Sequence, residues 1–508
     1  MKWLRALLIL ILSFVVLLGG LSCGKGGTGP ATDTTPPVIT NVSAIDIMGT
    51  SATITWITDE PATTEVAWSG IYRYGAISCS PPPDKHLVTD HSFKLTGLTA
   101  NSNYSVTVTS KDKAGNQQSQ NYILATHLEI GQVISCDTAW TKENSPYIIT
   151  GNVLVPSGVT LTIEPGVAVK FESGTGMQID GELVARGTEA EPIVFTSNPP
   201  FAGPGSWCNI LFTDSSIGAT FDQTESYVSG SIMQYCTVEY AGASKVYQDH
   251  EAIKILSSSP LIDHCTITGN AGGGIYMLRG SARVANNVIS NNSAVSWGGG
   301  ICCFYNDGAV SISGNTISNN SAGSGGGIYC DCYDGNLSIS GNNISHNSGE
   351  HDGSGLFCSC QGGVVSISGN TVSNNSGGGI SCLCYYGTVT VSGNTVNDNS
   401  ADFGGGVYCF VEHGTLSVNN NDIHGNSGNG VYINSGNPVI NHNNLVGNTT
   451  YEIYENDFSS HPPVDATDNW WGTTNGAEIL KKIGYQPDGA KLGIVNYSPY
   501  LTEPVPIM

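Results

Sequence analysis

Aromatic and acidic side chains recur in one region of the sequence at positions that could bind a ligand. The aromatic ones each stand one residue after an aliphatic position of a repeat: Tyr276, Tyr329, Phe357, Tyr408 and Tyr432. Cys302 and Ser381 take this place in two further copies, and Asp331 and Asp334 follow one of the rings. Ring faces are apolar and can stack, while carboxylates accept hydrogen bonds from hydroxyl groups. These side chains could therefore bind a carbohydrate. The alternative is that the rings stack on one another and only support the fold.

The same two acids raise the question of catalysis. Two carboxylates at a suitable separation can hydrolyse a glycoside, and two residues stand between Asp331 and Asp334. Acids in turns are usually solvated, so we expect this pair to be solvated rather than catalytic. The histidines do not fall at a metal-ligand spacing: His264, His346, His351, His413, His424 and His442. We predict no catalytic residue, no metal site and no cofactor.

Cysteines form a third regular set, with nine of the fifteen inside the repeats. Two columns are defined by spacing: Cys303, Cys330, Cys358, Cys382 and Cys409 stand two residues after the aliphatic position, and Cys332, Cys360 and Cys384 two residues further on. Alternation along a strand places both columns on the same face as the aliphatic residues. Free thiols, disulfides and thiolate metal ligands all remain open. We expect buried free thiols, because strands about 4.8 Å apart hold parallel Cβ atoms farther apart than the ~3.8 Å of a disulfide.

A phrase repeated between Val310 and Gly430 explains the regular spacing. Variants of Ser-Ile-Ser-Gly-Asn begin at Ser311, Ser338, Ser366, Thr390 and Ser417. One column of the alignment is asparagine, at Asn287, Asn315, Asn342, Asn370, Asn394, Asn421 and Asn443, with Cys236 and Cys265 in the same register upstream. A second column is aliphatic, at Ile275, Ile301, Ile328, Leu356, Ile380, Val407 and Val431. Short alternating segments between Gly, Asn, Ser and Asp predict strands and tight turns rather than helices.

Units of this length must stack to bury their apolar faces, which predicts a solenoid. In-register stacking would place the aliphatic column inside and make the asparagines a hydrogen-bonded ladder. The aromatic column would then point outward along one sheet.

The repeats resemble the right-handed parallel β-helix of pectate-lyase-like proteins. The segments at 162–170 (Thr-Ile-Glu-Pro-Gly-Val-Ala-Val-Lys), 205–207 (Gly-Ser-Trp) and 468–472 (Asp-Asn-Trp-Trp-Gly) look like the start and end of bacterial proteins of this kind. The resemblance implies a single-stranded β-helix over residues 128–501. We expect residues 151–195 to cap its first end, and a short helix at 476–483 and a strand at 494–501 to cap the other.

The resemblance also implies that the relatives of this protein include polysaccharide lyases and glycosidases. Lyases of this fold use Arg or Lys as the base, but only Arg279 and Arg283 lie between Lys254 and Lys481. The Gly-His-Gly or basic partner that accompanies paired acids in β-helix glycosidases is also missing around Asp331. A lyase or hydrolase therefore stays an alternative to a non-catalytic binding protein.

Residues 36–126 have a different pattern, with about seven short alternating strands that predict a β-sandwich. Trp56 on an early strand and Leu98 followed by Tyr104 resemble a fibronectin type III module. The resemblance implies that Trp56 lies in the core and that Tyr104 forms the tyrosine corner. The expected fold class is all-β.

The N-terminus predicts export. Lys2 and Arg5 precede an apolar run at 6–18, which is typical of a signal peptide over residues 1–22. Gly-Leu-Ser-Cys at 20–23 resembles a bacterial lipoprotein box, which implies lipid attachment at Cys23 and a flexible tether over residues 23–35. Ordinary cleavage without lipid remains the alternative.

The composition restricts the kinds of partner that we expect the protein to bind. Only 12% of residues are charged, yet the net charge is −23, which disfavours nucleic acid and anionic membrane surfaces. We expect a monomeric lipoprotein at the bacterial envelope or cell surface, anchored only through its lipid, which binds a polysaccharide or another surface partner. A purely structural envelope protein is the remaining alternative.

Overall fold

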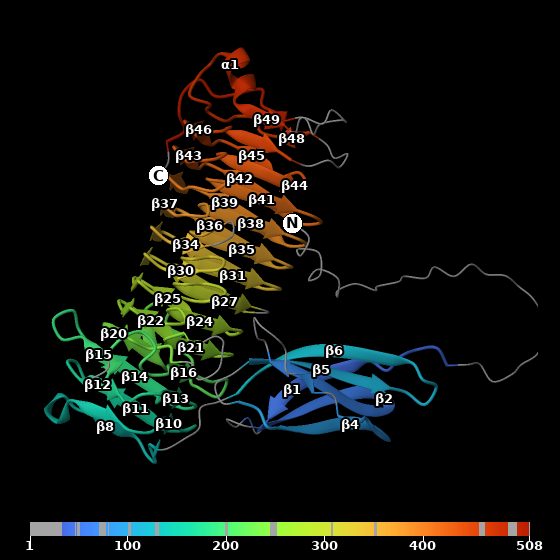
Figure 1. The fold of residues 1–508 in the computed structure, drawn as a ribbon, viewed down its shortest axis with the longest axis vertical. Helices are drawn as coiled ribbons and strands as arrows, with labels where there is room; N and C mark the ends of the chain where they lie inside the picture. The colour runs from blue at the N-terminus through green and yellow to red at the C-terminus, as the bar shows by residue number, and fades with distance from the viewer. Residues whose placement is uncertain are drawn as a thin grey trace, which may run out of the picture.

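Two all-β parts follow one another along the chain (Figure 1). The structure is a computed structural model that describes residues 33–45, 47, 51–70, 78–79, 81–99, 103–126, 132–198, 202–243, 251–305, 308–349, 353–456, 463–485 and 495–506. The predicted signal peptide and Cys23 lie outside these residues. Within the described residues, no helix is long and apolar enough to cross a membrane.

The first part is an antiparallel sandwich. Its strands are β1 (Ile39–Ile45), β2 (Ser51–Gly70), β3 (Ser78–Cys79), β4 (Asp84–Thr96), β5 (Asn103–Lys111) and β6 (Gln117–Ala125). Trp56 is buried, and its indole N–H donates to Ser110 Oγ at 2.9 Å. The hydroxyl of Tyr104 accepts the backbone N–H of Thr99 at 2.7 Å, which confirms the tyrosine corner.

The second part is a parallel solenoid with three long sheets, and most coils give one strand to each. The first sheet contains β7 (Gln132–Val133), β10 (Val153–Val155), β13 (Met177–Ile179), β16 (Ile210–Phe212), β21 (Ile253–Leu256), β24 (Ile275–Leu278), β27 (Ile301–Tyr305), β31 (Ile328–Cys332), β35 (Leu356–Cys360), β38 (Ile380–Cys384), β41 (Val407–Val411), β44 (Val431–Ser435), β47 (Ile453–Glu455) and β49 (Ile483–Tyr485).

The second sheet contains β8 (Thr138–Trp140), β11 (Thr160–Ile163), β14 (Glu182–Arg186), β19 (Ile232–Gln234), β22 (Leu261–Asp263), β25 (Arg283–Ala285), β28 (Ala309–Ser313), β32 (Asn336–Ser340), β36 (Val364–Ser368), β39 (Thr388–Ser392), β42 (Thr415–Asn419), β45 (Val439–Asn441), β48 (Val464–Asp465) and β50 (Val495–Asn496). The third sheet contains β9 (Tyr147–Ile149), β12 (Ala168–Phe171), β15 (Ile193–Ser197), β20 (Cys236–Glu239), β23 (Thr266–Thr268), β26 (Val288–Ser290), β29 (Thr316–Ser318), β33 (Asn343–Ser345), β37 (Thr371–Ser373), β40 (Thr395–Asn397), β43 (Asp422–His424) and β46 (Asn444–Val446). Two small pairs lie outside these sheets: β17 (Thr220–Phe221) with β18 (Tyr227–Ser229), and β30 (Ser321–Ala322) with β34 (Ser348–Gly349).

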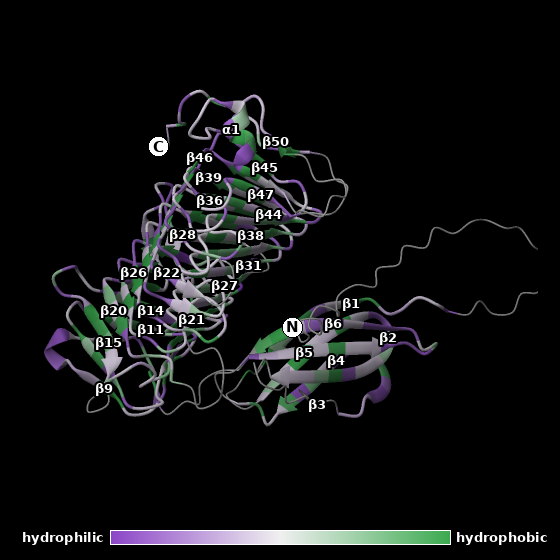
Figure 2. Ribbon diagram, turned by 45° about the horizontal axis from the view of Figure 1, so that its top comes forward, coloured by the Kyte–Doolittle hydropathy of each residue, from purple (hydrophilic) through white to green (hydrophobic). Residues whose placement is uncertain are grey.

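In-register stacking places the aliphatic column inside, as the spacing predicted. Ile328 pairs with Leu356, and Leu356 pairs with Ile380, so like residues face the interior in successive coils. All three are buried. In Figure 2 the hydrophilic residues of the solenoid concentrate in its turns, while the hydrophobic ones lie in the strands.

The predicted asparagine ladder is present at the turn between the second and third sheets. From Asn287 to Asn443 each side-chain Nδ2 donates to the Oδ1 of the next member at 2.9 to 3.0 Å, and Asn469 adds one more step. Cys265 begins the column: its backbone N–H donates to Asn287 Oδ1 at 2.7 Å, and its thiol donates to a main-chain carbonyl.

A second ladder runs beside the first and was missed from the sequence. Its members stand five residues after those of the first: Asn270, Asn292, Asn320, Asn347, Asn375, Asn399, Asn426 and Asn448. Their Nδ2 to Oδ1 distances are 2.8 to 3.1 Å. The signal was the second asparagine in each repeat, which is as regular as the first.

The ends of the solenoid differ from the expectation in part. Residues 151–195, expected as a cap, form strands β10 to β15 of ordinary coils, so a cap made by this segment is not confirmed. The predicted C-terminal helix is present as α1 (Gly476–Lys481), and its Ile479 joins the solenoid core. The predicted closing strand is only the two residues of β50.

The sandwich packs on the outer side of the first sheet near β21 and β24. Asn103 of β5 donates to the hydroxyl of Tyr276 at 3.4 Å and accepts from Lys254 Nζ at 3.3 Å. The guanidinium of Arg279 lies 5.0 Å from the centre of the Tyr122 ring. Because Lys254 and Tyr276 are buried, the two parts share an interface.

Candidate functional site

The outer side of the first sheet carries the aromatic column predicted from the sequence. Strand pairing aligns Tyr276, Cys302, Tyr329, Phe357, Ser381, Tyr408 and Tyr432 in successive coils. Tyr454, which the sequence analysis did not include, adds one more ring beyond Tyr432. The order and register of the column are therefore as predicted, but its exposure is not uniform.

Two of the five predicted binding rings are buried, which corrects the expectation that all point into solvent. Tyr276 is only 4% exposed because Asn103 and the rest of the sandwich cover it. Tyr432 is only 6% exposed because it lies between neighbouring rings and Phe403, whose centre is 5.5 Å away. Neither ring is available to stack on a ligand.

The lower group of exposed rings is centred on Tyr329 and Phe357. Their centroids are 4.9 Å apart and their planes differ by 2°, so the two rings stack on each other across two coils. Phe304 and Trp297 support Tyr329 from below, at 5.6 and 5.9 Å. The sequence analysis missed these two rings, because Phe304 stands two residues after the aromatic column and Trp297 lies in the preceding turn.

The upper group begins at Tyr408, which stacks on Tyr432 at 5.5 Å and 17°. Ser381 separates the two groups, so Phe357 and Tyr408 are two coils apart, about 10 Å. Phe410 and Tyr385, 5.3 Å apart, lie beside this gap. The partly exposed rings of both groups together form what we call the aromatic face: Tyr329, Phe357, Tyr385, Tyr408 and Phe410.

Asp331 lies on the aromatic face, two residues after Tyr329. Burial raises the pKa of its carboxyl above the usual value, although the hydroxyls of Ser359 and Tyr333 hydrogen-bond to it and lower the pKa in part. Its Oδ1 is buried without a hydrogen-bond partner. Asp331 is thus a partly protected acceptor beside two rings, whereas Asp334 is exposed in the following turn, as expected for a solvated acid.

Asp331 and Glu412 are too far apart to form a glycosidase pair. Glu412 is the other acid whose charge reaches this part of the face, since both carboxylates raise the pKa of Tyr385 together with burial of its ring. Glu412 follows β41, three coils from Asp331, which corresponds to about 14 Å. Paired catalytic carboxylates are about 5 to 9.5 Å apart.

The two cysteine columns point into the solenoid, as predicted. Cys303 to Cys409 occupy successive paired positions, and Cys332, Cys360 and Cys384 form the second column. All eight are buried free thiols in this structure. Burial raises the pKa of Cys358 and Cys382 well above that of an exposed thiol.

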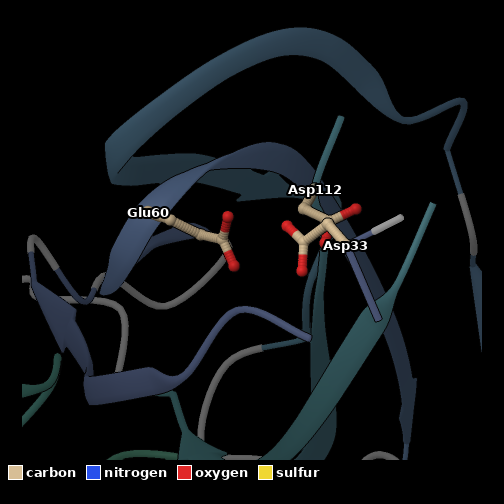
Figure 3. Close-up of side chains that lie close together, drawn as sticks. All are labelled: Asp33, Glu60 and Asp112. Carbon is tan, nitrogen blue, oxygen red and sulfur yellow. The ribbon is translucent and has the colours of Figure 1, made fainter. Parts of the chain in front are cut away.

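A cluster of three carboxylates in the sandwich was not foreseen from the sequence. Oxygens of Asp33, Glu60 and Asp112 lie within 4.8 Å of one another, and Figure 3 shows the three side chains converging. Burial and the charges of the two aspartates raise the pKa of Glu60. Asp112 is already hydrogen-bonded within its own loop by Gly115 and Asn116, so its carboxylate serves as a structural acceptor.

Three family models match successive parts of the chain. A fibronectin type III domain matches residues 36–125, a pectate-lyase-like β-helix domain matches 131–252, and a right-handed β-helix region matches 226–396 and 362–470. The chain is a fibronectin type III domain joined to a right-handed β-helix. The β-helix and sandwich expected from the sequence are thereby confirmed.

Curated relatives match only in part. Exoglucanase B of Cellulomonas fimi is 28% identical over 198 residues, covering 38% of this chain and 17% of that protein. Exoglucanase A of the same organism is 25% identical over 200 residues, covering 39% and 22%. Protein bark beetle of Drosophila melanogaster is 39% identical over 72 residues, covering 14% and 2%. The chain therefore spans less than a quarter of the length of each of these relatives.

Solved structures give a distant likeness. A periplasmic alginate epimerase superposes with a TM-score of 0.36 at 11% identity, covering 69% of this β-helix protein and 84% of the epimerase. The family 28 exopolygalacturonase of Yersinia enterocolitica gives a TM-score of 0.30 at 9% identity, covering 93% and 100%. At these values the likeness says nothing about substrate.

Proposed function

We propose that this β-helix protein binds a neutral polysaccharide on its aromatic face and does not cleave it. The observation that supports this most is the pair of Tyr329 and Phe357, whose parallel rings stack at 4.9 Å and are partly open to solvent. Together with Tyr408 it gives apolar ring surfaces in a line along the solenoid. Asp331, a half-buried acid beside them, is the carboxylate of this face.

The charge distribution favours a neutral ligand. No lysine or arginine occurs between Arg283 and Lys481, the region that contains the whole aromatic face. Asp331 and Glu412 give the face a negative charge, which would repel a polyanionic glycan. Because recognition would rest on stacking and hydrogen bonds, we expect binding to depend little on salt.

Export to the bacterial envelope, with a lipid on Cys23, is part of the same proposal. It rests on the basic start, the apolar run and the Gly-Leu-Ser-Cys sequence at 20–23. Relatives named as exoglucanases cover too little of this chain to assign it a substrate, but they agree with a carbohydrate-related role outside the cytoplasm. Cys23→Ala should move the protein from the membrane to the soluble fraction, and unchanged attachment would point to an uncleaved apolar anchor.

A glycan array tests the binding. Wild type should retain neutral glycans, and Tyr329→Ala and Tyr408→Ala should each weaken binding by roughly 2- to 12-fold, as expected for loss of one stacking contact of about 0.5–1.5 kcal/mol. Tyr386→Ala is the matched control: Tyr386 is 57% exposed, and its ring stacks on His413 rather than on a ring of the aromatic face. If no glycan is retained, or if all three variants behave like wild type, the rings have only a structural role.

Cleavage of a retained glycan would favour the second candidate, a hydrolase or lyase. The half-buried carboxyl of Asp331, on the same face as the rings, is the observation in its favour, since a carboxyl within reach of a bound glycan can serve in general acid–base catalysis. Product analysis of retained glycans with wild type and Asp331→Asn separates the two. Release of fragments by wild type and not by the variant would replace binding with catalysis.

A further inference from the structure

The three thiols at the ends of β31, β35 and β38 are placed differently from the other inward cysteines. Cys332 pairs with Cys360, and Cys360 pairs with Cys384, in consecutive coils. The thiol of Cys360 is in hydrogen-bond contact with both neighbours. We call these residues the corner thiols, because each is the last residue of its strand before the turn to the second sheet.

Their Cα atoms are about 4.8 Å apart, inside the 4.4–6.8 Å window of a disulfide. What opposes bond formation is the Cβ separation, which must fall by about 1 Å to reach the preferred ~3.8 Å. Residues at a strand end can move by this amount more easily than residues hydrogen-bonded on both sides. Whether a thiol pair can be oxidised therefore depends on its place in the strand.

Glycines at the corner provide this freedom. Gly362 and Gly363 stand one residue beyond the end of β35, after Gln361, and a side chain at Gly387 would collide with the sulfur of Cys360. A side chain at Gly414 would likewise collide with the sulfur of Cys384. The corner thus keeps space around the sulfurs that larger residues would fill.

The column of Cys303, Cys330, Cys358, Cys382 and Cys409, which we call the central column, lacks this freedom to move. Cys330, Cys358 and Cys382 are the central residues of five-residue strands, with paired neighbours on both sides. Bringing two of their Cβ atoms together would distort hydrogen bonds in two strands at once. Contact with Cys332 raises the pKa of Cys360 to about 11, and contact with Cys360 raises the pKa of Cys384 further; burial raises the pKa of Cys358 and Cys382 well above the usual value.

We propose that Cys360 forms a disulfide with Cys332 or Cys384 when the protein meets a disulfide-bearing oxidant, while the central column stays reduced. Two thiols lose two protons and two electrons as the S–S bond forms, and the oxidant's disulfide is reduced to two thiols. The third corner thiol stays next to the bond. Its thiolate can attack Cys360 and release the first partner, so the disulfide can move by one coil without a further oxidant.

Peptide mapping tests this on the full chain. The reduced protein is incubated with oxidised glutathione, both folded and during refolding from denaturant, then quenched with acid, denatured, alkylated and digested. We expect one new disulfide that joins Cys360 to Cys332 or Cys384, in either arm, while Cys330, Cys358 and Cys382 take up label.

Two serine variants make the result specific. Cys360→Ser should abolish any disulfide within the corner, because Cys332 and Cys384 are two coils, about 10 Å, apart. Cys382→Ser, on the same strand as Cys384 but in the central column, should oxidise like wild type. The proposal would be overturned by a disulfide within the central column or by an unchanged corner disulfide in Cys360→Ser. It would also be overturned if no disulfide formed in either arm under conditions that fully oxidise an exposed dithiol peptide.

Discussion

Asn342 and Asn343 offer a direct test of the ladder, because these neighbours in sequence have opposite surroundings. The Oδ1 of Asn342 accepts from the backbone N–H and the side-chain Nδ2 of Asn315, both at 2.9 Å. Its own Nδ2 donates to the carbonyl of Ile312 and to Asn370 Oδ1, also at 2.9 Å. Asn342 is buried, whereas Asn343 is exposed on β33.

Asn342→Ala removes four buried hydrogen bonds, each with a net contribution of about 0.5–1.5 kcal/mol. It also leaves the Asn315 N–H without its ladder partner. We expect a loss of about 2–6 kcal/mol in the free energy of unfolding of these coils, against less than about 0.5 kcal/mol for Asn343→Ala.

Hydrogen exchange by mass spectrometry measures this locally, which suits a stacked array whose coils can open separately. Peptides covering residues 310–345 should exchange much faster in Asn342→Ala than in wild type, while Asn343→Ala should leave them unchanged. The ladder would not be a source of stability if the two variants showed equal protection from hydrogen exchange. The same conclusion would follow if Asn342→Ala lowered the free energy of unfolding by less than about 1 kcal/mol.

Three further predictions concern other parts of the molecule. Burial lowers the pKa of His91, so the folded sandwich binds a proton on this imidazole less tightly than the unfolded chain does. The stability of the sandwich should therefore fall as pH falls below ~6.5. Urea unfolding at pH 7.5 and 5.5 should show this loss of stability, and His91→Gln should make it smaller. Arg279→Ala removes the contact with Tyr122 and should loosen the sandwich from the solenoid, which faster proteolysis between residues 126 and 132 would reveal. Arg186→Ala is the matched control, because it removes an arginine–tyrosine contact away from the interface, and it should not speed proteolysis there. Most of the buried cysteines should resist alkylation in the folded protein and react after denaturation without reductant; almost no label after denaturation would mean that the columns are disulfide-bonded.

The sequence predicted the order of the rings in the candidate site but not which of these rings are accessible to a ligand. The place of Tyr329, Phe357 and Tyr408 one residue after the aliphatic column is a property of the repeat, and stacking converts it into a row on one side of a sheet. Phe304 joined the row because side chains two residues apart on a strand share the same face, and Trp297 joined it from the turn before β27.

Local periodicity by itself determined the all-β class, the boundary of the sandwich, the inward columns of aliphatic and cysteine residues, and one of the two asparagine ladders. Each follows from the alternation of side chains along a strand and from the need of a short repeat to bury its apolar face against the next copy. No knowledge of distant contacts is needed for these features.

Only the tertiary structure decided which of the aligned rings a ligand could reach. Asn103 meets Tyr276 across 173 positions of the chain, and Phe403 covers Tyr432 from a turn of the preceding coil. A contact between separately folded parts depends on the shape and polarity of two surfaces, and the repeat that places Tyr276 in its column has no information about the sandwich that covers it.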